Sequence, residues 1–299
     1  MFGKTRDRQE STRRPALAME RLDVADLHFA DELPEGRLVD LPGRGSAFVR
    51  TAKGPAGAPT VLLLHGLMAT ADLNWSLAVP ALATRFNVVA PDLRGHGRGL
   101  PTKRFSGGEC ADDMAAIVRT LELGPVIVVG YSLGGLVAQL FVRRYPELVA
   151  GLVLCATASR FDVPSAKGAV KILDRAVRLV PEALRRSVML ALLAPRSADC
   201  ERGRWLMSEV RRHDTLAMLD AAAEAAQFNS ASWLGDSTCP AAVIVTQDDM
   251  VVSAEAQRDL ARILGRPSVY EIAGDHFACV KRPGEFNEAL TAACAGILA

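Results

Sequence analysis

The sequence lacks an excess of charge of either sign. Its 35 Lys and Arg residues balance 34 Asp and Glu residues, which gives a formal net charge of +1, and the basic residues are spread along the chain. Nucleic-acid-binding domains carry a clustered basic patch or stripe, so we expect no nucleic-acid partner. The 49% of hydrophobic residues in a chain of 299 favours a large buried core and small-molecule chemistry instead.

Paired cysteines are also missing. The chain has six cysteines, at positions 110, 155, 200, 239, 279 and 294. They form no CxxC pair, and no Cys/His cluster has the spacing of metal ligands. The spacing predicts buried, reduced thiols and no metal site.

The N-terminus lacks the apolar core of a secretory signal. Its first residues, MFGKTRDRQESTRRPA, are rich in Arg instead. This composition predicts a flexible tail over residues 1–36 and a cytoplasmic protein.

One stretch of nineteen residues, 124–142, carries no charged side chain. It is just long enough to cross a bilayer, but it contains Pro125 and several glycines, and its apolar pattern changes midway. The segment PVIVVG is β-branched and continuous, as in a strand that is buried on both faces. The segment LVAQLFVRRYPE then has a helical pattern that ends before Pro146. We therefore expect a strand, a sharp turn and a helix, and no integral membrane segment.

Strand and helix patterns alternate along the chain. Apolar runs typical of strands occupy residues 60–66, 87–92, 126–132, 151–158, 241–249 and 268–276. Helix-like segments occupy residues 74–86, 108–123 and 253–265 and the region after Ser132, and two weaker runs at 36–41 and 46–54 are candidates for antiparallel edge strands. This order predicts an α/β fold with a doubly wound, mainly parallel sheet, formed by residues 37–158 and 239–299.

The alternation stops between residues 159 and 238. Helical stretches follow one another there, at 167–180, 181–194, 202–212 and 214–228. Because ligands bind at the carboxyl edge of the strands in such sheets, we expect this insertion to be a helical cap over that edge.

The segment GYSLGG, residues 130–135, stands at the predicted strand-to-helix turn. Ser132 has Gly130 two residues before it and Gly134 two residues after it. Small flanking residues permit a tight, strained turn that presents the serine hydroxyl outward. Ser132 is therefore the candidate nucleophile.

A serine hydroxyl needs a base that takes its proton. The five histidines are at positions 28, 65, 96, 213 and 276. His276 follows the last predicted strand, so it lies at the same sheet edge as Ser132 and is the preferred base. His65 and His96 also lie near that edge, but each precedes a glycine and is more typical of a shaped turn; His96 is the second candidate.

The base in turn needs an acid that orients it and stabilises its charged form. Asp248 and Asp249 follow the predicted strand at 241–249. Asp249 is preferred because its loop position precedes the segment MVV, and Asp162 is a third candidate. The chain order serine, aspartate, histidine is the order of this architecture.

These motifs together resemble the α/β-hydrolase superfamily, in its compact bacterial esterase, lactonase and C–C hydrolase branch. The resemblance covers residues 37–297 and rests on LLHGLM, PDLRGHG, GYSLGG, the Asp after VIV and the terminal DHF. It implies an oxyanion hole formed by the backbone amides of Leu67 and Leu133, and it requires no metal or organic cofactor. The sequence departs from the family pattern at Thr246, where Gly is common, at Gly99 and at Asp275.

The resemblance implies a serine hydrolase that cleaves a carboxylic ester or a lactone through an acyl-enzyme on Ser132. The same triad also serves acyl transfer, perhydrolysis and C–C bond hydrolysis, and a non-catalytic ligand receptor is a further alternative. The cap is rich in aliphatic residues, which pack the helices or line a pocket for a hydrophobic ester. Candidate lining residues are Leu173, Val177, Met189 and Leu193. Lys171, Arg175, Arg178, Arg185 and Arg186 of the cap form a solvated face or meet a carboxylate or lipid surface.

Overall fold

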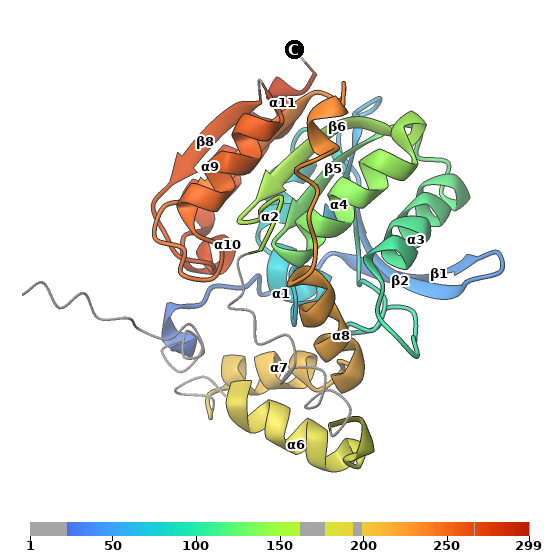
Figure 1. Ribbon diagram of the computed structural model, residues 1–299, viewed down its shortest axis with the longest axis vertical. Coiled ribbons are helices and arrows are strands. Elements are labelled where there is room, and N and C mark those ends of the chain that lie inside the picture. Colours follow the sequence, from blue (N-terminus) through green and yellow to red (C-terminus); the bar gives the residue numbers. More distant parts are fainter. Residues whose placement is uncertain (1–22, 162–176, 194–198, 266, 299) are drawn as a thin grey trace, which may run out of the picture.

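An eight-stranded sheet lies at the centre of the computed structural model, which describes residues 23–161, 177–193, 199–265 and 267–298 (Figure 1). The strands are β1 (Glu35–Leu41), β2 (Gly45–Ala52), β3 (Thr60–Leu64), β4 (Asn87–Pro91), β5 (Val126–Tyr131), β6 (Val149–Cys155), β7 (Ala241–Thr246) and β8 (Ser268–Ile272). Their order in the sheet is β1-β2-β4-β3-β5-β6-β7-β8. β2 pairs antiparallel with β1 and β4, and the other neighbours pair in parallel. The predicted doubly wound, mainly parallel sheet with antiparallel strands at one edge is confirmed.

Helices cover both faces of the sheet (Figure 1). They are α1 (Ala71–Trp75), α2 (Ala78–Ala83), α3 (Gly107–Thr120), α4 (Leu133–Arg144), α9 (Ala254–Ile263), α10 (Ala278–Lys281) and α11 (Pro283–Gly296). Successive residues of a strand point to opposite faces. In β3, Val61 and Leu63 therefore join the core under α1, α2 and α11, whereas Leu62 and Leu64 join the core under α3 and α4.

Two features of the helices differ from the sequence prediction. The segment 74–86 is not one helix, since α1 ends at Trp75 and α2 begins at Ala78. Pro80 gives the reason, because proline has no N–H to bond to the carbonyl four residues earlier and its ring crowds that position. The C-terminal helices α10 and α11 have no counterpart among the predicted segments.

The insertion between β6 and β7 contains α6 (Glu182–Leu193), α7 (Glu201–Val210) and α8 (Thr215–Ala225). These helices lie together on one side of the sheet in Figure 1. The turn between α7 and α8 touches the loops that follow β3 and β4, because His213 bonds to the carbonyl of Met68 and the Asp214 amide bonds to the carbonyl of Gly95. The helical insertion thus sits over the carboxyl ends of these parallel strands.

The N-terminal segment before β1 packs against the core at Val24 and Leu27, a contact that the predicted flexible tail over residues 1–36 does not include. A short 3-10 turn spans Val24–Asp26, and the side chains of Val24 and Leu27 are only 1% and 2% exposed. Their spacing of three residues places both on one side of the turn, where burying them is favourable. Residues 1–22 lie outside the described part of the chain.

The thiols and the uncharged stretch are also placed by the structure. All six cysteines are free; four are buried, whereas Cys200 is exposed and Cys239 is partly exposed, so the prediction of buried thiols is wrong at these two. The stretch 124–142 forms β5 and α4 in the core. Among the helices in the described ranges, none combines the length and the apolar character that a bilayer crossing needs.

Candidate active site

Ser132 stands at a strained turn between β5 and α4. Its φ of +52° lies in the left-handed region that side chains other than glycine rarely adopt. A Cβ on Gly130 would lie 2.4 Å from the carbonyl oxygen of Gly134, and a Cβ on Gly134 would lie 2.1 Å from that of Leu64. Both distances are far below van der Waals contact, so the spacing of GYSLGG is a steric requirement of this turn.

His276 lies in the loop between β8 and α10, and its ring reaches Ser132. Its Nε2 is 2.9 Å from Ser132 Oγ. The Tyr131 hydroxyl donates to the backbone carbonyl of His276 at 3.0 Å, and the two rings meet edge to face. This distance and this support permit proton transfer between the hydroxyl and the imidazole.

Asp249 completes the chain of hydrogen bonds. Its Oδ2 is 2.8 Å from His276 Nδ1, and its side chain is fully buried. The other oxygen, Oδ1, accepts from the backbone amides of Val251 and Val252, both at 2.8 Å. The carboxylate is therefore held in one orientation from both sides.

The competing acids differ in position. Asp248 is exposed, and its backbone amide bonds to the carbonyl of Gly274. Asp162 lies outside the described residues. Of the two described candidates, the structure brings Asp249 to His276.

Thr246 and Gln257 form a buried polar pair behind Asp249 that the sequence prediction missed. Thr246 Oγ donates to Asp249 Oδ2 at 2.8 Å, and Gln257 Nε2 donates to Thr246 Oγ at 2.9 Å. Both side chains are fully buried. The only sequence signal was the departure at Thr246, where glycine is common in the superfamily; a glycine has no hydroxyl with which to make this contact.

Three other histidines form a buried cluster of their own. The ring of His96 lies 5.2 Å from that of His65 and 5.5 Å from that of His213, centroid to centroid. Burial lowers the pKa of His65, holds the pKa of His96 well below its usual value and lowers the pKa of His213 to about 4. These rings are therefore neutral near pH 7, and His276 is the one histidine of the described residues that contacts Ser132.

The two residues whose amides are predicted to form an oxyanion hole are placed by the structure, since Leu133 directly follows Ser132 and Leu67 lines the same cavity. Leu133 is the first residue of α4, and amides in the first turn of a helix have no partner within it. Leu67 lies in the loop after β3 and lines the same cavity as Ser132. The next residue, Met68, has a φ of +60°, and His213 donates from Nε2 to its carbonyl at 3.0 Å. A residue of the cap thus fixes the loop that carries Leu67.

Two apolar cavities meet at this loop. One, of about 270 Å³, is lined by Ser132 and His276 and by apolar side chains of the N-terminal segment, α7 and α10. The other, of about 460 Å³, lies between the same loop and helices α6 and α8. Leu67 and Met68 line both cavities. This loop is therefore bordered by apolar walls on two sides.

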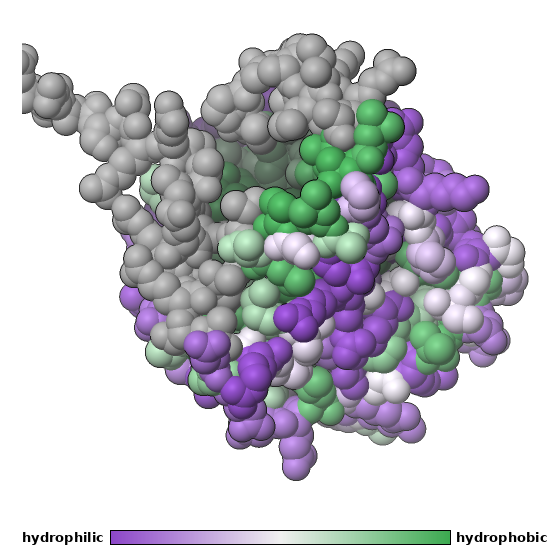
Figure 2. Space-filling model, turned by 90° about the horizontal axis from the view of Figure 1, so that it is seen from below, coloured by the Kyte–Doolittle hydropathy of each residue, from purple (hydrophilic) through white to green (hydrophobic). Residues whose placement is uncertain are grey.

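The cap residues named from the sequence are partly described. Val177 and Met189 line the larger cavity, whereas Leu173 and the side chain of Leu193 lie outside the described residues. Hydrophobic side chains also gather on the surface of this side of the molecule (Figure 2). Those exposed on the cap include Leu179, Leu184 and Val188.

Three of the cationic cap residues named from the sequence contact other cap residues. The pairs are Arg178 with Asp220, Arg186 with Glu182 and Arg185 with Thr215, while Lys171 and Arg175 lie outside the described residues. Each of the three is at least partly exposed, so they contribute to a solvated face of the cap.

Two departures from the family pattern have local explanations. A Cβ on Gly99 would lie 2.2 Å from the carbonyl oxygen of Leu93, so this loop has no room for a side chain there. Asp275, next to His276, pairs with Lys281 of α10 at 2.7 Å. Its charge is therefore neutralised within the loop.

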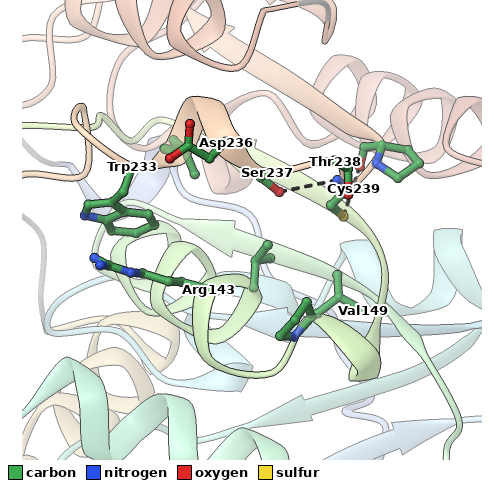
Figure 3. A pocket seen from close by; sticks show the side chains of 11 residues that line it. Arg143, Val149, Trp233, Asp236, Ser237, Thr238 and Cys239 are labelled. Atoms are coloured by element: carbon green, nitrogen blue, oxygen red, sulfur yellow. Dashed lines mark hydrogen bonds between the residues drawn. The ribbon is translucent and has the colours of Figure 1, made fainter.

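A further cavity, of about 510 Å³, lies away from Ser132, between the end of α4 and the segment 233–240 (Figure 3). Figure 3 shows Arg143 beneath the ring of Trp233, and the guanidinium is 4.5 Å from the ring centroid. Its lining includes none of Ser132, Asp249 and His276. It is therefore separate from the candidate active site.

Comparison with known proteins places this architecture in a family. The family model described as alpha/beta hydrolase fold matches residues 59–283. The chain belongs to the α/β-hydrolase family. The matched range includes Ser132, Asp249 and His276 as well as the cap.

Individual relatives agree with this membership. A pimeloyl-[acyl-carrier protein] methyl ester esterase from Chromobacterium violaceum is 32% identical over 242 residues, which cover 78% of this chain and 92% of that protein. An uncharacterized protein from Mycobacterium tuberculosis is 39% identical over 97 residues, but the match spans only 32% of this chain and 28% of that protein. The crystal structure of a hydrolase from Pseudomonas aeruginosa superposes with a TM-score of 0.72 at 21% identity and covers 89% of this chain and 98% of that one, which shows a shared fold.

Proposed function

We propose that this α/β-hydrolase is a serine hydrolase that cleaves a carboxylic ester or lactone through an acyl-enzyme on Ser132. The observation that carries the proposal is the unbroken chain of hydrogen bonds from Ser132 Oγ through both nitrogens of His276 to Asp249. The strained turn presents the hydroxyl to an apolar cavity, where a carbonyl carbon is able to approach it.

The reaction has two halves. In the first, His276 Nε2 takes the proton of Ser132 Oγ as the oxygen attacks the carbonyl carbon, and the amides of Leu67 and Leu133 donate to the oxyanion. The intermediate collapses when the ester C–O bond breaks, and His276 gives its proton to the departing alkoxide. In the second half, His276 deprotonates a water molecule that attacks the acyl-enzyme, and Ser132 regains its proton as the carboxylic acid leaves. Asp249 orients the imidazole and stabilises its charged form in both halves.

The walls of the two cavities support a small to medium hydrophobic substrate. Apolar side chains dominate both, and the cavity at Ser132 is slightly below the usual size range of small-molecule pockets. The methyl ester esterase from Chromobacterium violaceum, which matches most of this chain, also supports ester cleavage.

Hydrolysis of p-nitrophenyl esters of increasing acyl length tests the proposal. We expect the wild type to turn over, and we expect Ser132→Ala to lower kcat by a factor on the order of 10⁴ or more, because the members of a triad act as a unit. Ser159→Ala is the matched control, since it removes another buried hydroxyl that does not line the cavity. Equal activity of wild type and Ser132→Ala would overturn the acyl-enzyme. If both proteins are inert on every ester, ester hydrolysis is no longer the favoured function, and acyl transfer, C–C bond cleavage or ligand sensing replaces it.

The adjacent aspartates provide a second matched pair in the same assay. Asp249→Asn leaves the shape of the site intact but favours the wrong imidazole tautomer, so kcat falls by about 10⁴-fold, as in the general Ser-His-Asp template. Asp248→Asn removes an exposed charge one residue away and leaves kcat close to the wild-type value.

A further inference from the structure

The N-terminal segment Val24–Phe29 packs in one hydrophobic cluster with side chains of α7 and of the core, and it lies near the cap helices in Figure 1. Leu27 and Phe29 line the 270 Å³ cavity that also contains Ser132 and His276. Neither residue belongs to the sheet, the helices or the loops that carry the hydrogen-bonded triad. Part of the wall of the site is therefore built from chain that precedes the first strand.

The core holds this segment in place on one side. The backbone amide of His28 donates to the carbonyl of Val280 at 2.8 Å, and that of Ala30 lies 3.4 Å from Ser76 Oγ. Val280 belongs to α10, which follows the loop of His276. The position of the segment is thus linked directly to the element that follows His276.

The cap holds the segment on the other side. Arg202 of α7 donates to the carbonyl of Leu27 at 3.2 Å. The ring of Phe29 meets the ring of Trp205 edge to face, with centroids 4.8 Å apart. Because Leu206 of the same helix also lines the cavity, α7 and the N-terminal segment together form one continuous wall.

We propose that Leu27 and Phe29 determine specificity by limiting the length of the apolar group that the substrate places beside Ser132. This inference rests on the proposed function. A cavity of 270 Å³ lies just below the usual range of small-molecule pockets, so it suits a short chain better than a long one. Leu27 is 2% exposed and faces the core, whereas Phe29 is partly exposed and stands between the cavity and solvent. Removal of the Phe29 ring therefore opens the cavity outward.

The test compares the acyl-length profiles of Phe29→Ala, Leu27→Ala and Val24→Ala on p-nitrophenyl esters from acetate to laurate. For Phe29→Ala we expect the ratio of kcat/KM on laurate to kcat/KM on acetate to rise about tenfold or more, which is the size of effect that a few methylene groups produce in an apolar pocket. Leu27→Ala shifts the profile in the same direction. Val24→Ala is the control, because Val24 is buried in the same segment but does not line the cavity; it lowers Tm and leaves the ratio unchanged.

A second readout separates this inference from the proposed function. In a Ser132→Ala background, calorimetry measures binding of methyl alkanoates from acetate to laurate without turnover, and we expect Phe29→Ala to shift the preferred length upward. If binding shifts but the parent protein hydrolyses no ester, the inference that Leu27 and Phe29 limit the bound length holds and the proposed function is wrong. If the parent hydrolyses esters and neither variant shifts the profile, or if Val24→Ala shifts it equally, the inference is wrong. Absence of both binding and hydrolysis overturns both.

Discussion

Asp249 Oδ2 receives three hydrogen bonds, from His276 Nδ1 and the Thr246 hydroxyl at 2.8 Å each and a longer one from Gln257 Nε2 at 3.3 Å. Gln257 fixes the second donor, because its amide group donates to Thr246 Oγ. A carboxylate held only by the two backbone amides on Oδ1 would rotate more freely about the bond between Cβ and Cγ. We interpret Thr246 as a positioning residue that keeps Oδ2 in line with the imidazole.

Two variants of Thr246 separate the effect of its hydroxyl on activity from the effect of its shape. Thr246→Val keeps the volume but removes the donor, and a hydrogen bond to a charged group is worth about 1.5–3 kcal/mol. We expect kcat on p-nitrophenyl esters to fall about tenfold with KM unchanged, because roughly half of that free energy acts on the orientation of the imidazole in the transition state. Thr246→Ser keeps the hydroxyl and retains most of kcat. A purely structural role would instead lower Tm in both variants and leave kcat per folded molecule unchanged in both.

The residues of the candidate site were predicted from the sequence to different extents. Ser132 and His276 could be placed because each follows a recognisable strand, and the carboxyl ends of parallel strands share one edge of the sheet. The choice between Asp248 and Asp249 remained open in the pattern, since adjacent residues of one loop differ only in the direction of their side chains. The hydrogen bond from Thr246 to Asp249 could not be predicted from the sequence, because it depends on the backbone path of the turn that follows β7.

At the scale of elements, His213 joins the α7–α8 turn to two loops of the core. Its Nε2 donates to the carbonyl of Met68, and its Nδ1 accepts from the amide of Gly97 at 3.0 Å. Only the neutral imidazole both donates and accepts in this way. Protonation would turn Nδ1 into a donor that faces another donor, and burial already lowers the pKa of His213 to about 4.

This linkage predicts a loss of stability in acid. The pKa of His213 is lower in the folded chain than its usual value of about 6.5, so the unfolded chain binds the proton more readily. Titration of His213 leaves the free energy of unfolding unchanged above about pH 6.5. As pH falls toward about 4, it lowers this free energy by up to ~3 kcal/mol. His213→Gln removes the titration, so urea unfolding at about pH 7 and about pH 4.5 will show a smaller difference in the free energy of unfolding than in the wild type. His65 and His96 act in the same direction and remain, so a residual difference is expected; an unchanged difference would rule out His213 as a contributor.

The boundaries of elements show where local patterns are insufficient. All eight strands could be located because buried parallel strands and alternating edge strands have distinct apolar patterns. The break at Pro80 was missed because the flanking apolar residues continue the helical spacing on both sides of it. Packing of Val24 and Leu27 was missed because two apolar residues in a polar neighbourhood carry no periodic signal, and their burial depends on a surface provided by distant parts of the chain.

At the scale of the whole molecule, a buried ionic network joins the cap to the core. Arg98, in the loop after β4, bonds to Asp72 of α1 at 2.6 Å, to Asp92 at 3.3 Å and to Glu209 of α7 at 3.2 Å. The three carboxylates are almost completely buried, while the Arg98 guanidinium also lies 4.0 Å from the ring centroid of Phe48. One side chain therefore contacts three acids from separate parts of the chain, two of which also pair with a second arginine.

Replacement of Arg98 tests how strongly this network couples the cap to the core. Arg98→Met keeps an apolar stem but leaves the buried acids short of one partner, and breaking a buried pair in this way typically costs about 3–5 kcal/mol. We expect the lower end, because Asp72 keeps its bonds to Arg50 and Glu209 keeps its bond to Arg212. In a chain of this size such a loss lowers Tm by about 5 °C.

The double variant Arg98→Met/Glu209→Gln distinguishes coupling from simple loss of packing. Glu209→Gln removes the charge on the cap, so in the absence of Arg98 it relieves a buried acid left with Arg212 as its one cationic partner and raises Tm, whereas in the wild type the same change removes a favourable pair and lowers Tm. The two effects of Glu209→Gln therefore have opposite signs, and the interaction free energy from the double-mutant cycle exceeds about 0.5 kcal/mol. Additive changes in Tm would show that Arg98 stabilises the core alone. In that case, the contacts of His213 and of the N-terminal segment would be what holds the cap in place over Ser132.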